Sequence, residues 1–147
     1  MIGILTGAAA GAAGTTALNA ATYIDMAVRA RPASGTPQQT VEKLAEKADL
    51  QVTDDNRLAG LGNLSGIATG VGVGAAFGLL RRLGLRPPMP VGALLVGLTA
   101  MAATDGSMAA LKISDPRTWS RTDWLSDLVP HLVYGTVTYA TLQALDK

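Results

Sequence analysis

The sequence predicts an all-α, polytopic membrane protein with four transmembrane helices and one short amphipathic helix in a loop. Charged residues make up 16 % of the 147 residues, against roughly 25 % in ordinary soluble domains. A helix of about 23 residues spans about 35 Å and crosses a hydrocarbon core about 30 Å thick. Charges are absent from four runs of such lengths or slightly shorter: 1–24, 58–80, 87–104 and 128–145. This length fits a single membrane domain over 1–147.

The first two expected spans, about 2–27 and about 58–80, carry glycine at every fourth position. In water each interior glycine destabilises a helix by about 1 kcal/mol relative to alanine, whereas in lipid the backbone must stay hydrogen-bonded. Rows of small residues let a neighbouring backbone approach closely. We expect the rows to pack on each other within the chain, or one of them to pack across a homo-oligomer. The rows are Gly3, Gly7 and Gly11, and Gly62, Gly66, Gly70, Gly74 and Gly78.

An amphipathic helix is expected outside the membrane at about 37–49. Thr36 is the predicted N-cap, Pro37 fits the first helical position and Gln39 would complete a capping box. Apolar residues recur along one side of this segment, between charged ones. The helix would lie on lipid headgroups or against the protein, or would serve as a solvated connector.

The last two expected spans cover about 91–111 and about 125–145. An arginine- and proline-rich turn precedes the third span, and a polar loop precedes the fourth. Ser120 and Asp123 predict a second capping box at the end of that loop.

An even number of spans puts both termini on the same side of the cell (inner or plasma) membrane. Lys and Arg are more numerous in the two long connecting segments, and the positive-inside rule then favours extracytoplasmic termini. Three arginines in the turn at 81–86 argue for the opposite orientation.

Polar residues within the spans gather in the half of the bundle next to the long segments. Asp127 and His131 are placed to hydrogen-bond at a spacing of four residues, and ionisable residues in a membrane usually face the bundle interior or an aqueous cavity. Alternatively, Asp25 and Asp127 lie at headgroup level and His131 is a structural hydrogen-bonding residue. The candidate polar cavity comprises Asn19, Asp25, Asn63, Asp105, Asp127, His131 and Tyr134.

Several functional classes find no support in the sequence. The net charge of +1 gives no basic excess for nucleic acid. Cysteine is absent and there is one histidine, which makes a metal site a weak case. The stretch "GVGVGAAFG" follows no predicted strand, as a phosphate-binding loop would. We therefore predict no enzyme, no catalytic residues, no cofactor and no metal.

The opening "GILTGAAAGAAGTTALN" and the closing "PHLVYGTVTYATL" resemble small four-helix integral membrane proteins of unknown function from high-GC, actinobacterial-type bacteria. This resemblance implies an inner-membrane protein and supplies no activity or site residues. The expected function is a structural or accessory role, in contact with membrane lipid and packing with itself or with a larger membrane complex. The alternative is a small homodimeric transporter or channel whose polar half-cavity binds a cation or a proton.

Overall fold

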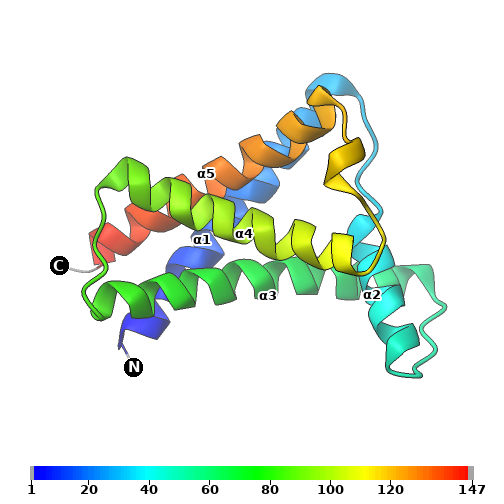
Figure 1. Ribbon diagram of the computed structural model, residues 1–147, viewed down its shortest axis with the longest axis horizontal. Coiled ribbons are helices and arrows are strands. Elements are labelled where there is room, and N and C mark those ends of the chain that lie inside the picture. The colour runs from blue at the N-terminus through cyan, green and yellow to red at the C-terminus, as the bar shows by residue number, and fades with distance from the viewer. Residues whose placement is uncertain (1, 146–147) are drawn as a thin grey trace.

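The computed structural model describes residues 2–145, and over these residues it is all-α, without strands, as predicted (Figure 1). The short helix α2 (Thr36–Lys47) and the 3-10 turn η1 (Pro116–Thr118) lie in the two long connections. Four long helices alternate in direction along the chain: α1 (Ile2–Arg29), α3 (Asp55–Arg82), α4 (Met89–Ala110) and α5 (Arg121–Leu145).

Capping side chains set the starts of α3 and α5. The Asp54 carboxylate accepts a hydrogen bond from the Arg57 amide at 2.9 Å. Before α5, the Ser120 amide donates to Asp123 Oδ2 at 3.0 Å, and the Asp123 amide donates to Ser120 Oγ at 3.2 Å. The predicted capping box is therefore present, and α5 begins at Arg121, before the expected start of the span at residue 125. The hydrogen bonds from Ser120 lower the pKa of Asp123 below its ordinary value.

The predicted cap of α2 is wrong. Gly35, not Thr36, is the N-cap residue, and no side chain caps the helix. Thr36 already belongs to the helix, and its hydroxyl lies 2.8 Å from Ser34 Oγ, which also accepts from the Thr36 amide at 3.3 Å. Because Thr36 lies inside the first turn and not at the N-cap position, the capping box with Gln39 does not form.

The long helices pack in the order α3, α1, α5, α4. α1 lies between α3 and α5, and α5 packs on α4, whereas α3 and α4 share few contacts although a tight turn joins them. Figure 1 shows α1 and α5 running side by side and obliquely to α3 and α4. The two pairs therefore diverge toward the end that carries the long connections.

The backbones of α1 and α3 touch along the two glycine rows, within one chain. A Cβ on Gly74 would lie 2.5 Å from the Gly11 Cα, and a Cβ on Gly11 would lie 2.5 Å from the Gly70 carbonyl oxygen. Both distances are too short for any side chain. The same contact brings Gly3 and Gly7 against Gly78.

Two glycines of the second row lie outside this contact. A Cβ on Gly62 would meet α2 instead, 2.9 Å from the Pro37 carbonyl carbon, and a Cβ on Gly66 would meet nothing within 4 Å. The expectation that Gly66 packs against a helix is not met in this chain. A row with a spacing of four advances about 40° per step around a helix, so its two ends face different neighbours.

Glycine also brings α4 and α5 together, which no regular row in the sequence indicated. A Cβ on Gly97 would lie 2.6 Å from the His131 carbonyl oxygen, and a Cβ on Gly135 would lie 2.6 Å from the Gly97 amide nitrogen. Gly92 faces the Tyr139 ring. The α4–α5 interface is thus a backbone contact filled by one large aromatic ring.

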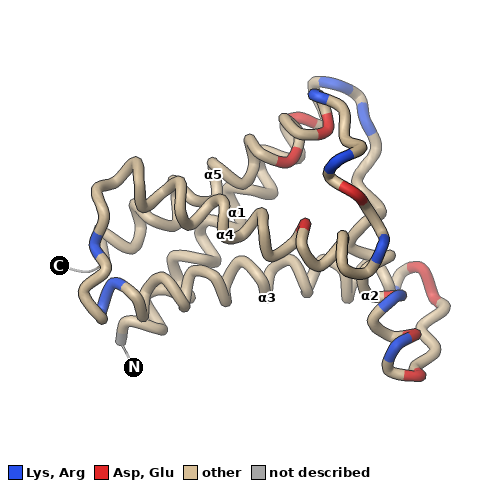
Figure 2. The backbone as a smooth tube through the Cα atoms, viewed as in Figure 1, with Lys and Arg blue, Asp and Glu red and all other residues tan. Residues whose placement is uncertain are grey.

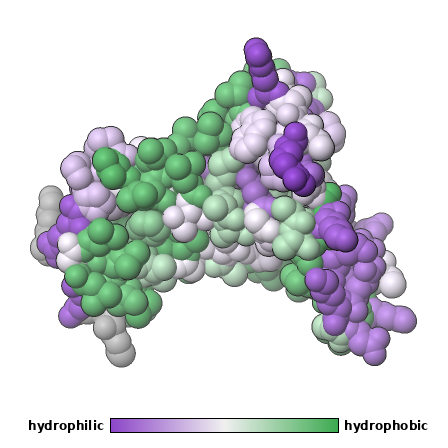
Figure 3. Space-filling model, viewed as in Figure 1, coloured by the Kyte–Doolittle hydropathy of each residue, from purple (hydrophilic) through white to green (hydrophobic). Residues whose placement is uncertain are grey.

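Small residues dominate the interior, and most large apolar residues lie outside. Small buried residues include Ala10, Ala93, Ala100 and Thr138. The larger buried apolar and aromatic side chains are Leu58, Phe77, Val96, Met101, Tyr134, Tyr139 and Leu142. Figure 3 shows an apolar outer surface along the long helices and a hydrophilic one over α2 and the connections. Exposed large side chains on the long helices include Ile4, Leu5, Ile24, Val28, Leu61, Leu64, Ile67, Leu79, Leu80, Val91, Leu94, Leu95, Leu98, Leu125 and Val129.

Charges gather at the two ends of the molecule, and among the described residues the end with the α3–α4 turn shows Lys and Arg but no Asp or Glu (Figure 2). The exception is Asp105, within α4. Four spans were expected, and among the described residues two helices, α3 and α4, are long and apolar enough to cross a membrane. Only 22 % of the most apolar 18-residue stretch of α3 is buried, and 39 % of that of α4, so neither resembles the core helix of a soluble protein.

Candidate functional site

Three ionisable side chains meet where α4 packs on α5, in the half of the molecule next to the long connections. Asp105 comes from α4, and Asp127 and His131 come from successive turns of α5. Asp105 and His131 are each 8 % exposed, while the side chain of Asp127 retains 24 % exposure. The structure thus brings together three of the candidate residues, two of them nearly fully buried.

His131 is held by the turn of α5 that precedes it. Its Nδ1 lies 2.8 Å from the Asp127 carbonyl oxygen, and since a carbonyl only accepts, Nδ1 carries the hydrogen. The same nitrogen lies 3.4 Å from Asp127 Oδ1. The expected contact at a spacing of four residues is therefore present, with the backbone carbonyl as its main acceptor.

The carboxyl groups of Asp105 and Asp127 are neighbours across the helix interface and act on each other electrostatically. Asp105 Oδ1 and Asp127 Oδ2 are buried and have no hydrogen-bond partner among the described residues. Because ionised carboxylates only accept hydrogen bonds, the two groups can bond to each other only when one of them carries a proton. The sequence did not reveal this pair, because nothing local relates position 105 to position 127.

Tyr134 lies one turn beyond His131 and serves a different contact. It is 1 % exposed, and its hydroxyl donates to the Gly70 carbonyl oxygen at 2.6 Å. A Cβ on Gly14 would lie 2.9 Å from the Tyr134 ring. Tyr134 therefore joins α5 to α3 across α1 and closes the interior beyond the acidic pair.

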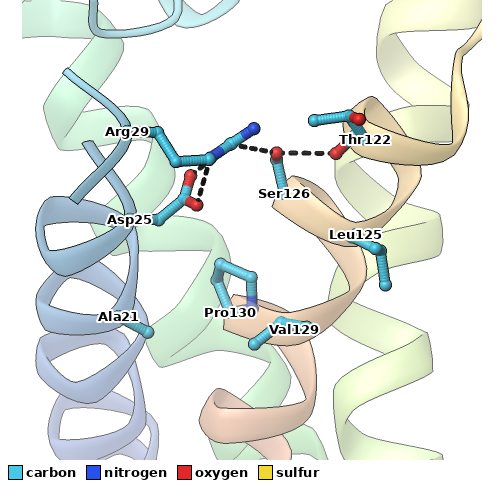
Figure 4. Close-up of a pocket in the computed structure, with 8 residues that line it drawn as sticks. All are labelled: Ala21, Asp25, Arg29, Thr122, Leu125, Ser126, Val129 and Pro130. Carbon is cyan, nitrogen blue, oxygen red and sulfur yellow. Dashed lines mark hydrogen bonds and ion pairs between the residues drawn. The ribbon is translucent and has the colours of Figure 1, made fainter. Parts of the chain in front are cut away.

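Asp25 belongs to a separate site at the end of α1. Its carboxylate binds Arg29 Nη2 at 2.5 Å and Arg31 Nε at 2.6 Å, and Arg29 Nη2 also donates to Ser126 Oγ at 2.5 Å. Figure 4 shows Asp25, Arg29 and Ser126 beside a groove of about 270 Å³ between α1 and α5. The site ties α1 to the first turns of α5. The groove is lined by Ala21, Asp25, Arg29, Thr122, Leu125, Ser126, Val129 and Pro130.

The two asparagines do not join the acidic pair. Asn19 is half-buried on α1, and Asn63 is exposed on α3. The expectation that Asn63 lines a cavity is therefore corrected. Gly62 and Gly70 occupy the buried face of α3, and Asn63 follows Gly62 by about 100° around the helix, which turns it outward.

A polar contact at the opposite end was not expected. Arg81 is 8 % exposed; its Nη1 donates to the Tyr139 hydroxyl at 2.9 Å, and its guanidinium carbon lies 5.1 Å from the centre of the Tyr139 ring. The Tyr139 hydroxyl donates to the Pro87 carbonyl oxygen at 2.6 Å. The only sequence signal was that Arg81 and Tyr139 each stand near the same end of the expected bundle.

The chemistry open to the acidic pair is limited. Within residues 2–145 no group of three or more His, Asp or Glu side chains is arranged to hold a metal ion. The pair and His131 offer carboxyl oxygens and one free imidazole nitrogen, which exchange protons readily. Comparison with protein families, with characterised proteins and with solved structures finds no match for this chain.

Proposed function

We propose that this chain is a small integral membrane protein in which all four long helices cross the cell membrane, and that its role is structural or accessory. It packs with a second copy or within a larger membrane complex. Its helices hold one another by close backbone contact and leave their large apolar side chains to lipid or to partner helices.

The observation that carries the proposal is the distribution of residue sizes. In water, burial of large apolar side chains supplies the main favourable free energy of folding. Here Ala, Gly and Thr fill most of the interior, and Leu, Ile and Val cover the outside of the long helices. Membrane helices associate through small residues in this way, because lipid is as apolar as leucine.

Among the described helices α1 and α5 do not reach the apolar character of a span that α3 and α4 reach, but several of their threonine hydroxyls bond within their own helix. Thr15 Oγ1 donates to the Gly11 carbonyl at 2.8 Å, and Thr16 Oγ1 donates to the Ala12 carbonyl at 3.0 Å. On α5, Thr136 Oγ1 donates to the Leu132 carbonyl at 2.8 Å. A threonine bonded to its own helix presents mainly its methyl group, which supports spans for these two helices as well.

An accessory role is supported by what the described surface offers. The exposed apolar side chains extend along the outer faces of α3 and α4, where Leu61, Leu64, Leu94 and Leu98 are each at least 40 % exposed. These apolar faces can pack against lipid or against the helices of another membrane protein.

Two measurements test the proposal. The chain should stay with membranes through an alkaline carbonate wash, and native mass spectrometry after mild-detergent purification should show a homo-oligomer or a stable complex. Recovery as a detergent-free cytosolic particle would contradict the membrane assignment. A monomer in every mild detergent, with no co-purifying protein, would contradict the accessory role alone.

A small homodimeric transporter or channel for a cation or proton is the second candidate, favoured by the buried Asp105 and its partner on α5. It predicts flux in proteoliposomes that Asp105→Asn or His131→Ala abolishes without loss of folded protein. Flux that neither change alters, or no flux at all, would rule it out.

A further inference from the structure

We infer that Asp105 and Asp127 form a binding site for a single proton, shared between the two carboxyl groups and reached only from the end with the long connections. This inference goes beyond the structural role proposed above, because it assigns a ligand to the α4–α5 interface. It also differs from the transport alternative, because a site open at one end binds a proton without conducting it.

The first argument is the state of the Asp105 side chain. It is 8 % exposed, its Oδ1 has no hydrogen-bond partner among the described residues, and its polar neighbour is another carboxyl group. Two ionised carboxylates in contact repel each other strongly, and a shared proton removes the repulsion, as it does in the paired carboxyl groups of aspartic proteases. A cation is therefore required to neutralise part of the negative charge of the two carboxyl groups, and a single proton is enough to do so.

A metal ion fits this site poorly. Ions that prefer carboxylate ligands take about six oxygen ligands, whereas the two aspartates and His131 do not form a group suited to hold one. The backbones of α4 and α5 touch at Gly97 and His131, so an ion with several ligands would fit only if this close contact were broken. A proton needs neither extra ligands nor extra space.

The charged groups that act on the pair are few. Asp105 and Asp127 act on each other, and His131 on the same helix as Asp127 is the third member. On α1, which packs against α5, Arg29 and Arg31 are bound to Asp25. α3 places glycine, not charge, against the neighbouring Tyr134.

Access to the pair is one-sided. The Asp127 side chain is 24 % exposed, so a proton from hydronium can bond to its carboxylate oxygen, releasing water, and then be shared with Asp105. Beyond His131 the interior closes, because Tyr134, Thr138 and Tyr139 are 1 %, 0 % and 0 % exposed. Release of the proton by the same route would leave two negative charges in contact and weaken the hold of α4 on α5.

Infrared spectroscopy of the purified full-length protein tests the site directly. The wild type should show the C=O band of a buried protonated carboxylic acid at neutral pH, shifted in D₂O and lost at high pH. Asp105→Asn and Asp127→Asn should each remove it. Asp25→Asn and Asp115→Asn, which alter carboxylates bound to arginine, should leave it unchanged.

Three results would overturn the inference: no such band in the wild type at any pH above about 5, a band that survives both Asp105→Asn and Asp127→Asn, or a band removed by Na⁺ but not by choline. The last would indicate a sodium site. If the asparagine variants fail to fold, the pH titration and the Na⁺ comparison on the wild type still decide. The infrared measurement is made on protein in detergent and reports only on the proton site. A negative result there is therefore distinct from a negative result in the carbonate wash or in native mass spectrometry, which test the proposed function.

Discussion

Gly74 has no room for even a methyl group. In Gly74→Ala the new Cβ would lie 2.5 Å from the Gly11 Cα, a backbone atom that cannot turn aside. Overpacking of this kind destabilises by about 1–3 kcal/mol, so we expect a lower unfolding midpoint in mild detergent. Gly66→Ala is the matched control, since its Cβ meets nothing within 4 Å, and it should be neutral or slightly stabilising. Equal losses in the two variants would mean that the α1–α3 contact is not the one described.

Tyr134 tests a single buried hydrogen bond. Tyr134→Phe keeps the ring that fills the interior and removes the hydroxyl that reaches the Gly70 carbonyl at 2.6 Å. We expect a loss of about 1 kcal/mol, the usual contribution of one such bond, measured by denaturant unfolding in micelles. Tyr23→Phe, at a tyrosine that is 63 % exposed, should change stability little. No loss in Tyr134→Phe would show that the hydroxyl finds no better partner in the folded state than in the unfolded one.

At this scale the sequence predicts contacts that are local and misses those that are not. The proximity of Asp127 and His131 follows from helix geometry alone, and the structure has it. The pairing of Asp105 with Asp127 depends on which helices are neighbours and on their register, so no spacing within one segment predicts it. Arg81 and Tyr139 were missed for the same reason.

The helices α1 to α4 all end in the same way. The helices α1 to α4 are each followed by a residue in the left-handed region, and only one of these is glycine. The next amide then bonds back to the carbonyl five residues earlier, as Arg31 N does to Met26 O at 3.2 Å. The four left-handed residues are Ala30, Asp49, Gly84 and Lys112.

Ala30→Gly should therefore stabilise the protein. The left-handed conformation costs an ordinary residue about 1–2 kcal/mol, and glycine offsets part of this gain because its unfolded state is more flexible. We expect a net gain of about 0.5–1 kcal/mol in the free energy of unfolding. Ala12→Gly, at an exposed position inside α1, should give no such gain, because the backbone there is helical and does not favour glycine. A loss in both variants would contradict the cap geometry at Ala30.

The elements themselves were predictable because charge marks their limits. Each uncharged run lies largely within one long helix, and the Ser120–Asp123 box starts α5. The cap at Thr36 was wrong because the helix begins one residue earlier, with Gly35 at the N-cap, and the sequence does not fix a helix start to one residue. The approximate extent of each helix is thus encoded locally, whereas the residue at which a helix starts depends on three-dimensional geometry.

For the whole molecule, the sequence does not determine the packing order of the helices. Two glycine rows predict that the helices bearing them can touch, and α1 and α3 do so along part of each row. α5 lies between α1 and α4. It meets α4 at Gly97, Gly135 and Tyr139, and it meets α1 at Gly14, contacts that lack a repeating spacing. Non-periodic contacts of this kind are visible only in three dimensions.

The number of membrane crossings is a whole-molecule property with a clean test, because the chain has no cysteine. Single cysteines at Ser34 and Leu83, before α2 and in the α3–α4 turn, should react with a membrane-impermeant maleimide from opposite sides of sealed vesicles. Leu145→Cys, at the end of α5, is the deciding position. With four crossings, Leu145→Cys reacts from the same side of the vesicle as Leu83→Cys, since the ends of α3 and α5 lie at the same end of the molecule (Figure 1). If only α3 and α4 cross, with α1 and α5 lying outside the bilayer, Leu145→Cys labels with Ser34→Cys, and the four-span architecture is excluded.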